Sequence, residues 1–444
     1  MKNPLYYLLL CCICYFPSVL LSQSNVLLII ADDLGVDYLA SYGEGTDVPH
    51  TPTLDSLAAQ SVLFRNAWTN PLCSPTRASV LTGRYPFRHG VGSAIVGRLK
   101  GAGISTDEWT IPKALDSHTD YRAACTGKWH LSTSENGDNE NPNMMGFKHF
   151  SGSLPAQPIP SYNNWRKTIN GENKFCDNYA TTDNVNDAIQ WIDQQTEANP
   201  WFHWLAFNAA HIPIHLPPKE LHSYDSLSGK LLNVQRQPIP YFKAMVEAMD
   251  TEIGRLFAAL AKKGTLKNTH VIFIGDNGTW GKVVQAPFDP DRAKGTLYEG
   301  GLNVPLFISG PAVNMPGRES KALVNSTDLF ATILEMAQVD MKVALPDSIQ
   351  LDSHSLLPYL KNPLQSNIRP WVFAEMFDFD KDADGKAIRD QQYKLIRFDK
   401  GQEELYNLTL DPFETRNLFA KSLDLQARMH YRYLSRELDA LLNK

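Results

Sequence analysis

Asn25-Val26-Leu27-Leu28-Ile29-Ile30-Ala31-Asp32-Asp33-Leu34-Gly35 is the stretch that decides the fold. Its first seven residues, which are apolar from Val26 onward, form a run of strand length that is typical of a strand buried on both faces of a sheet. Adjacent carboxylates at the end of a buried strand are costly without a cation. Asp32 and Asp33 are therefore candidate ligands of a hard metal ion, and the alternative is a helix cap beside a solvated acid.

The same pattern, an apolar strand followed by polar residues, returns along the chain. We expect strands at residues 62–68, 121–125, 201–207, 269–274 and 304–309, and helices at 53–60, 111–117, 181–195, 241–263 and 327–338. This alternation predicts an α/β fold with a large, mostly parallel sheet covered by helices. In such sheets ligands bind beyond the carboxyl ends of the strands, so the polar residues at those ends are expected to converge.

A polar, proline-containing linker at residues 361–368 precedes a region with a different pattern. Strands are expected at 371–376, 393–398 and 404–408, with turns at 381–385 and 400–401, before a helix over 423–442. Strands that follow one another without an intervening helix predict a small antiparallel sheet, here with one helix. We therefore divide the chain into a large α/β domain over 25–364 and a C-terminal α+β subdomain over 365–444.

The N-terminus has the composition of a secretory signal over residues 1–24. Lys2 precedes an apolar run from Leu5 to Leu21, and the run is short and interrupted by Pro17. This favours a cleaved signal, and so a secreted or periplasmic protein, over a stable membrane anchor. The net charge of −6, with both signs interspersed, gives no basic footprint for nucleic acid.

Removal of the signal would leave Cys73, Cys125 and Cys176. Ser74 as a helix cap, Pro75 at the first helical position and Gly83 as a stop would set Cys73 just before a short helix. Unpaired amides and Arg77, one turn on, would then favour an anion at residue 73. The residues alone leave a nucleophile and a buried or disulfide-bonded cysteine open. If Cys73 is chemically modified, the other two cysteines are available to pair.

Three further groups of polar residues lie at predicted strand ends. Lys128 and His130 share one side if the backbone stays extended, although a surface lysine beside a core histidine is the plainer interpretation. His211 projects from a loop that prolines keep extended, with His215 as its competitor. Asp276-Asn277 is an ordinary turn by itself, but beside Asp32 and Asp33 it completes an all-oxygen metal shell.

Cys73-Ser74-Pro75-Thr76-Arg77, continued to Gly83-Arg84, resembles the signature of the type I sulfatases, the formylglycine-dependent, arylsulfatase-like branch of the alkaline phosphatase superfamily. Asp32-Asp33, Gly127-Lys128-Trp129-His130, His211, Asp276-Asn277 and the stretch from Arg292 to Gly301 resemble further motifs of that family in the same order. The likeness covers residues 25–328 strongly and the C-terminal part more weakly. Gly275 departs from it, because the family usually has a hydroxyl residue before this Asp.

The resemblance implies the sulfatase-like α/β fold and hydrolysis of a sulfate monoester. It implies that a maturation enzyme oxidises Cys73 to Cα-formylglycine, whose hydrate attacks sulfur in line. His211, with Lys294, would protonate the departing alcohol, and His130 would deprotonate the second hydroxyl so that sulfate leaves. The implied catalytic residues are Cys73, Arg77, Lys128, His130, His211 and Lys294, with Lys282 a rival of Lys294. The implied ligands of Ca²⁺, with Mg²⁺ as the alternative, are Asp32, Asp33, Cys73, Asp276 and Asn277.

The substrate is expected to be a sulfated carbohydrate or a small aryl sulfate. Loops over 132–178 and 282–292, together with the C-terminal subdomain, are expected to shape the pocket, with Trp165, Trp280 and Arg292 as candidate contacts. Two other functions suit the same residues. One is hydrolysis of a phosphate or phosphonate monoester, and the other is binding of a sulfated glycan without catalysis.

Overall fold

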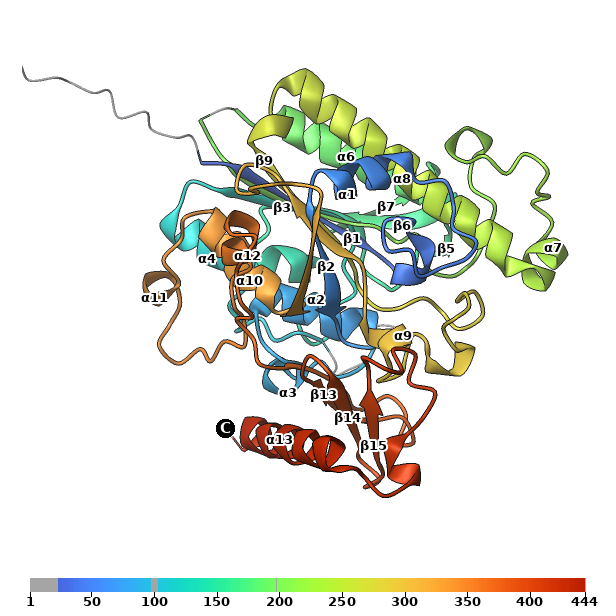
Figure 1. Ribbon diagram of the computed structural model, residues 1–444. Helices are drawn as coiled ribbons and strands as arrows, with labels where there is room; N and C mark the ends of the chain where they lie inside the picture. Colours follow the sequence, from blue (N-terminus) through green and yellow to red (C-terminus); the bar gives the residue numbers. More distant parts are fainter. Residues whose placement is uncertain (1–22, 97–102, 197, 444) are drawn as a thin grey trace, which may run out of the picture.

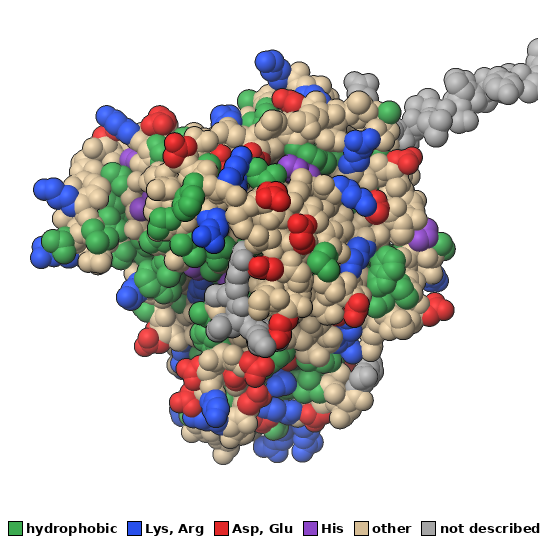
Figure 2. Space-filling model, turned by 180° about the vertical axis from the view of Figure 1, so that it is seen from behind, with side chains coloured by type: hydrophobic (Ala, Val, Ile, Leu, Met, Phe, Trp, Pro, Cys, Tyr) green, Lys and Arg blue, Asp and Glu red, His purple; other side chains and the backbone are tan. Residues whose placement is uncertain are grey.

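The computed structural model describes residues 23–96, 103–196 and 198–443 (Figure 1). The predicted signal therefore lies outside the described residues, except for its last two positions. Within the described part, none of the helices combines the length and apolar character that crossing a bilayer requires. Figure 2 shows acidic and basic side chains interspersed over one face of the molecule.

One sheet of eleven strands forms the centre of the molecule, in the order β11-β2-β10-β9-β1-β8-β3-β4-β6-β5, with β7 paired to β6. The strands are β1 (Asn25–Ala31), β2 (Val62–Trp68), β3 (Arg122–Lys128), β4 (His149–Ser153), β5 (Pro160–Ser161), β6 (Asn164–Ile169), β7 (Glu172–Cys176), β8 (Trp201–Ala206), β9 (Thr269–Gly275), β10 (Leu306–Ser309) and β11 (Arg318–Asn325). β1 pairs in parallel with β8 and β9, and all its residues are buried, as its apolar run predicts.

Helices cover both faces of this sheet (Figure 1). Alternate residues of β1 divide between two cores, with Leu28 and Ile30 facing one and Leu27 and Ile29 the other. The first core takes in α2 (Cys73–Thr82), α4 (Ile111–His118) and α10 (Asp328–Met336), and the second α1 (Pro52–Ala59), α6 (Ala180–Asp193) and α8 (Pro238–Lys263). Shorter helices are α3 (Pro86–His89), α5 (Asn141–Met144), α7 (Leu231–Arg236), α9 (Glu299–Leu302), α11 (Met341–Ala344) and α12 (Leu357–Lys361). The predicted fold class is confirmed.

The C-terminal part forms a second, antiparallel sheet in the order β12-β13-β14-β15. Its strands are β12 (Val372–Met376), β13 (Gly385–Arg389), β14 (Tyr393–Phe398) and β15 (Glu403–Asn407), and α13 (Leu425–Leu442) packs on β13 and β14. The small sheet with one helix is therefore confirmed. β13 follows the predicted turn directly and was not expected, because Lys386 and Arg389 interrupt its apolar pattern.

A buried group of charges joins this sheet to the part of the chain that contains the large sheet. We call Glu299, Arg389, Lys394 and Glu414 the seam cluster. Glu299 Oε1 accepts from Trp68 Nε1 at 3.1 Å and lies 3.3 Å from Lys394 Nζ, while its Oε2 lies 3.1 Å from Arg389 Nη1. Glu414 Oε1 lies 2.8 Å from Lys394 Nζ, and its Oε2 accepts from the Glu299 amide at 2.5 Å. Three of the four carboxylate oxygens therefore have a hydrogen-bond partner, and the fourth, Glu414 Oε1, has only the ion pair with Lys394.

The prediction of irregular loops over residues 132–178 is wrong, because this region contains α5 and four strands, β4 to β7. Lys167 interrupts the alternation of apolar and polar residues that would have indicated β6, because its charged side chain is buried. Its Nζ lies 2.5 Å from Oδ2 of Asp183 and 2.5 Å from Oδ2 of Asp187. Trp165 is fully buried and donates to the Asn178 carbonyl at 3.1 Å. It is a core residue, so its candidacy as a substrate contact is also wrong.

The pairing considered for Cys125 and Cys176 does not form, and both are free thiols. Cys125 packs in the core with Phe150 on one face of the large sheet, whereas Cys176 packs with Trp165 on the other face. The sheet itself therefore separates the two sulfur atoms.

Candidate active site

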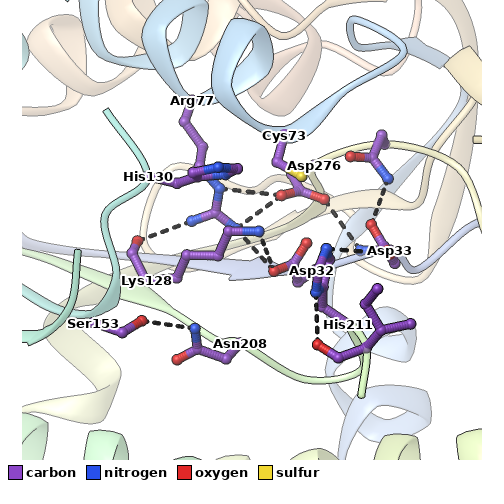
Figure 3. Close-up of polar contacts among 12 residues, drawn as sticks. Asp32, Asp33, Cys73, Arg77, Lys128, His130, Ser153, Asn208, His211 and Asp276 are labelled. Atoms are coloured by element: carbon purple, nitrogen blue, oxygen red, sulfur yellow. Dashed lines mark hydrogen bonds and ion pairs between the residues drawn. The ribbon is translucent and has the colours of Figure 1, made fainter. Parts of the chain in front are cut away.

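Polar side chains from distant parts of the chain converge at one edge of the large sheet (Figure 3). We call them the site cluster: Asp32, Asp33, Cys73, Arg77, Lys128, His130, His211, Asp276, Asn277 and Lys294. Ligand atoms of Asp32, Asp33, Cys73 and His211 lie within 4.8 Å of one another, and all four residues are buried. The convergence expected from the carboxyl ends of the strands is thus present.

Asp32 and Asp33 follow β1 directly, and both are buried. Asp32 Oδ2 lies 2.5 Å from Lys128 Nζ, and Asp33 Oδ1 forms an ion pair with Lys294. Burial, with Asp276 and Asp33 nearby, raises the pKa of Asp32 well above its ordinary value, although Lys128 and Arg77 oppose this. Burial acts on Asp33 as well, but Lys294, His211 and Lys128 outweigh it and hold the pKa of Asp33 below its ordinary value.

Asp276 and Asn277 follow β9, the neighbour of β1. Asp276 Oδ1 accepts from the Asp33 amide at 3.1 Å, and its Oδ2 accepts from Arg77 Nη2 at 2.8 Å. Asn277 Nδ2 donates to Asp33 Oδ1 at 2.9 Å. A Cβ atom on Gly275 would lie 2.3 Å from the Leu34 carbonyl oxygen, which explains glycine before Asp276.

Cys73 begins α2, and Leu72, not Ser74, is the capping residue. The expected cap is wrong because Ser74 Oγ instead donates to the His130 carbonyl at 2.9 Å. Gly83 ends the helix with φ 70°, as predicted. Cys73 Sγ lies 3.6 Å from Lys294 Nζ. Burial nevertheless raises the pKa of the Cys73 thiol to about 11, against the opposing effect of Lys128 and Lys294, so the unmodified residue is a neutral thiol.

Lys128 ends β3, and both it and His130 belong to the cluster, but the extended backbone expected between them is absent. Gly127 has φ 100° and His130 has φ 60°. A Cβ atom on Gly127 would lie 1.9 Å from the Ala206 carbonyl oxygen of β8, which explains glycine at this position. His130 Nε2 lies 2.8 Å from the Ile95 carbonyl oxygen, which leaves Nδ1 without a partner among the described residues. Burial, then Lys128, lowers the pKa of His130 well below its ordinary value.

Between the two candidate histidines, His211 is the one that reaches the cluster. Its Nε2 lies 4.0 Å from Asp33 Oδ2, and its Nδ1 lies 2.8 Å from the Ile212 carbonyl oxygen. Burial, with Lys128 and Lys294 acting in the same direction, lowers the pKa of His211 to about 3 despite Asp33. His215 instead bonds to the hydroxyl of Tyr179 at 3.0 Å, away from these carboxylates.

Lys294, and not Lys282, contacts Asp33 and Cys73. Burial would lower the pKa of Lys294, but Asp33 and then Cys73 outweigh it and raise the pKa, so the ammonium form is held. Lys282 Nζ lies 5.2 Å from the ring centre of Trp280. The candidate contact Arg292 stacks on the ring of Tyr298 at 4.7 Å.

Sequence reasoning missed a set of residues that hold the loop after β8. Asn208 Nδ2 donates to Ser153 Oγ at 2.8 Å (Figure 3). The Asp32 amide donates to the Ala209 carbonyl at 3.0 Å, and the Ala210 amide donates back to the Asp32 carbonyl at 2.8 Å. Asn208 follows a buried strand, which was an available signal, whereas Ser153 had none because β4 was not expected.

The donor set suits a hard divalent cation. Asp32 Oδ1 and Asn277 Oδ1 are buried and accept no hydrogen bond from any residue in the described ranges. Leaving such acceptors without partners costs free energy, and a cation between them would remove that cost. The ligands are carboxylate and amide oxygens, the type that Ca²⁺ and Mg²⁺ prefer. The residues therefore fit a metal of this class.

Two family models match the chain. The model described as Sulfatase matches residues 24–339, and the model described as N-sulphoglucosamine sulphohydrolase, C-terminal, matches residues 291–441.

Individual proteins agree with these models. Arylsulfatase J of Mus musculus is 25% identical, over 90% of this chain and 73% of that protein. N-acetylgalactosamine-6-sulfatase of Homo sapiens is 30% identical over 76% of this chain, which spans 65% of that relative's length. The crystal structure of Ps i-CgsB superposes with a TM-score of 0.78 at 25% identity, covering 94% of this chain and 92% of that one. The chain belongs to the sulfatase family of sulfuric ester hydrolases.

Proposed function

We propose that the protein hydrolyses sulfate monoesters of carbohydrates at the site cluster. The observation that carries the proposal is the meeting of three buried carboxylates and three cations around Cys73. Asp32, Asp33 and Asp276 face Arg77, Lys128 and Lys294 in ion pairs at one edge of the sheet. The lysines are the groups that would hold the anionic sulfuryl oxygens of a substrate.

Relatives support a carbohydrate substrate. One is named N-acetylgalactosamine-6-sulfatase, and Ps i-CgsB has been crystallised with k-i-k-neocarrahexaose. Secretion through the signal predicted at residues 1–24 belongs to the same proposal, because it would bring the enzyme to extracellular glycans.

Asp32, Asp33, Asp276 and Asn277 would hold the divalent cation, for which we propose Ca²⁺ with Mg²⁺ as the alternative, and residue 73 would complete the set. When bound, the cation supplies polarisation of a sulfate oxygen and lowers the cost of a negative charge at residue 73. Charge balance supports a divalent ion. With all three carboxylates ionised, the carboxylates and cations of the cluster cancel, so two added positive charges would match one ionised nucleophile and one monoanionic ester.

Residue 73 would act after oxidation of Cys73 to Cα-formylglycine by a maturation enzyme. That modification supplies a hydrate whose hydroxyl attacks sulfur. The raised pKa of the Cys73 thiol supports the need for it, since an unmodified, neutral thiol is a weak nucleophile here. Arg77, on the same helix α2, would hold residue 73 in position. Its Nη2 lies 2.8 Å from Asp276 Oδ2.

The two histidines would move protons. His211 Nε2 is the open ring atom, because Nδ1 faces the Ile212 carbonyl, and it would pass a proton to the departing oxygen with Lys294 nearby. An anionic ester between Lys128 and Lys294 would offset their effect on His211 and raise its pKa toward the working range. His130 Nδ1, which lacks a partner among the described residues, would take the proton whose removal expels sulfate.

Turnover of 4-nitrophenyl sulfate and 4-nitrophenyl phosphate, compared under one set of conditions, tests the reaction class. The two esters share a leaving group, so the ratio of kcat/KM reports the preference for sulfur over phosphorus. We expect the sulfate to be the faster substrate, and a panel of sulfated sugars then to identify the alcohol. A much larger rate with the phosphate would assign a phosphoester hydrolase, and binding of sulfated sugars without turnover would assign a glycan binder.

A further inference from the structure

The loop that carries His211 closes on itself directly after β8. The His211 amide donates to the Asn208 carbonyl at 2.9 Å, and the Ala210 amide donates to the Asp32 carbonyl at 2.8 Å. The loop is therefore tied to the first metal-ligand candidate as well as to its own start. The direction in which the imidazole projects depends on these backbone contacts.

Tyr162 holds this turn from outside the loop. Its hydroxyl lies 2.5 Å from the Asn208 carbonyl oxygen and 2.9 Å from the His211 carbonyl oxygen. Because the hydroxyl has one hydrogen to donate, it is shared between the two carbonyls at the start and end of the turn. Tyr162 lies between β5 and β6 and is only 2% exposed, so water does not compete for these contacts.

We propose that Tyr162 is a positioning residue that sets the place of His211 for proton transfer to the leaving group. It acts through the backbone of His211 and touches none of the reacting atoms. The inference rests on the proposed function, since it assigns Tyr162 a part in the step for which His211 is responsible. A displaced imidazole would slow that step, because proton transfer requires hydrogen-bond distance to the leaving oxygen.

Tyr179 offers a matched control. Its ring centre lies 6.1 Å from that of Tyr162, and its side chain is buried as well. Its hydroxyl bonds to His215 Nε2 at 3.0 Å, whereas the carbonyls at the two ends of the turn that carries His211 bond to the hydroxyl of Tyr162. Replacing either tyrosine by phenylalanine removes one buried hydroxyl and leaves the ring in place.

The test compares Tyr162→Phe and Tyr179→Phe with two substrates. One is the sulfated sugar that wild type hydrolyses fastest, whose alcohol needs a proton to leave. The other is 4-nitrophenyl sulfate, whose phenolate leaves without one. We expect Y162F to lower kcat on the sugar sulfate about tenfold, a part of the 10²–10⁴ that general acid catalysis supplies. On the aryl sulfate we expect a change under about threefold, and for Y179F the same ratio of the two rates as in wild type.

A merely structural role for Tyr162 would slow both substrates equally, and that result would overturn the inference, as would unchanged kcat on the sugar sulfate. His211→Ala should show the same dependence on the leaving group as Y162F, and thermal unfolding of each variant separates loss of fold from loss of position. Wild-type protein that hydrolyses neither sulfate ester would instead overturn the proposed function.

Discussion

The site cluster and the seam cluster are both buried groups of carboxylates and cations, but they differ in how their acceptor atoms are used. In the seam cluster, three of the four oxygens of Glu299 and Glu414 have hydrogen-bond partners, and the fourth, Glu414 Oε1, accepts no hydrogen bond but lies 2.8 Å from Lys394 Nζ in an ion pair. In the site cluster, Asp32 Oδ1 and Asn277 Oδ1 accept no hydrogen bond within the described residues.

This difference separates a structural ion network from a candidate catalytic one. A satisfied buried network holds two parts of a chain in one arrangement and has no capacity for a further ion. Buried acceptors without partners lower stability, and a bound ion is one explanation for their retention. The two clusters lie close in the chain, since Glu299 follows Lys294 by five residues, so variants in each make a direct comparison.

The largest expected effect is on chemistry at the site cluster. Cys73→Ala is expected to lower turnover of a sulfate ester by a factor of about 10³ or more, because no other group at this position supplies the nucleophile. Cys125→Ala is the control, since its thiol is equally buried but packs in the core. Turnover is measured per folded molecule, and Cys73→Ala with near wild-type turnover would exclude residue 73 as the nucleophile.

In the seam cluster the expected effect is on stability. Lys394→Met leaves Glu299 and Glu414 with one fewer cation in a buried place, which typically costs about 3–5 kcal/mol. We expect urea unfolding to show a loss of this size, while kcat of the folded protein changes less than about threefold. An unfolding free energy equal to that of wild type would mean that the seam cluster does not hold the two parts together.

The next effect is stabilisation by a metal ion, which should depend on the site cluster and not on the seam cluster. Ca²⁺ at a hundredfold excess over its Kd would stabilise the protein by about 2.7 kcal/mol, visible as a rise in Tm after prior treatment with chelator. Asp32→Asn should abolish this rise, and Glu414→Gln should retain it. The opposite pattern, with the response lost only in Glu414→Gln, would move the metal site away from the candidate ligands.

The effect that is smallest per step of one pH unit is a pH dependence of stability, and it belongs to the seam cluster. Burial raises the pKa of Glu414 to about 7, against the opposing effect of Lys394, whereas the unfolded value is about 4.3. Between about pH 4.3 and pH 7, Glu414 therefore binds a proton in the folded state but not in the unfolded state. The stability from that proton is fully present below about pH 4.3 and is lost as pH rises through 7, at up to about 1.4 kcal/mol per unit.

Glu414→Gln removes this titration, so the unfolding free energy of wild type relative to the variant should fall between pH 5 and pH 8. Denaturant unfolding at both values measures it. A difference that stays constant over this range would show that Glu414 does not titrate there.

The sequence predicted what depends on apolar runs and on the order of motifs. Continuous apolar stretches such as Asn25–Ala31 identified strands buried on both faces, and topology then brought Asp32 and Asp276 together from opposite parts of the chain. An apolar run does not indicate the direction of its strand. The antiparallel pairing of β10 with β2 and β9 therefore could not be predicted from the sequence.

The remainder depends on contacts between residues far apart in the chain. Ser74 is a good local cap, but a hydrogen bond to the His130 carbonyl takes its hydroxyl. A lysine in a sequence usually indicates a surface position, but Lys167 is buried in ion pairs with Asp183 and Asp187. The sequence pattern of β6 therefore did not indicate a strand. Tyr162 has no local signal at all, because its partners are carbonyl oxygens that any residue could supply.

Mass spectrometry of the peptide that contains Cys73, measured alongside turnover of 4-nitrophenyl sulfate, tests the central claim most directly. Conversion of the thiol to the aldehyde makes the peptide about 18 Da lighter, by the mass balance of the oxidation. We predict that turnover across separate preparations rises in proportion to the converted fraction. Full turnover in a preparation whose Cys73 is entirely unmodified would contradict the account.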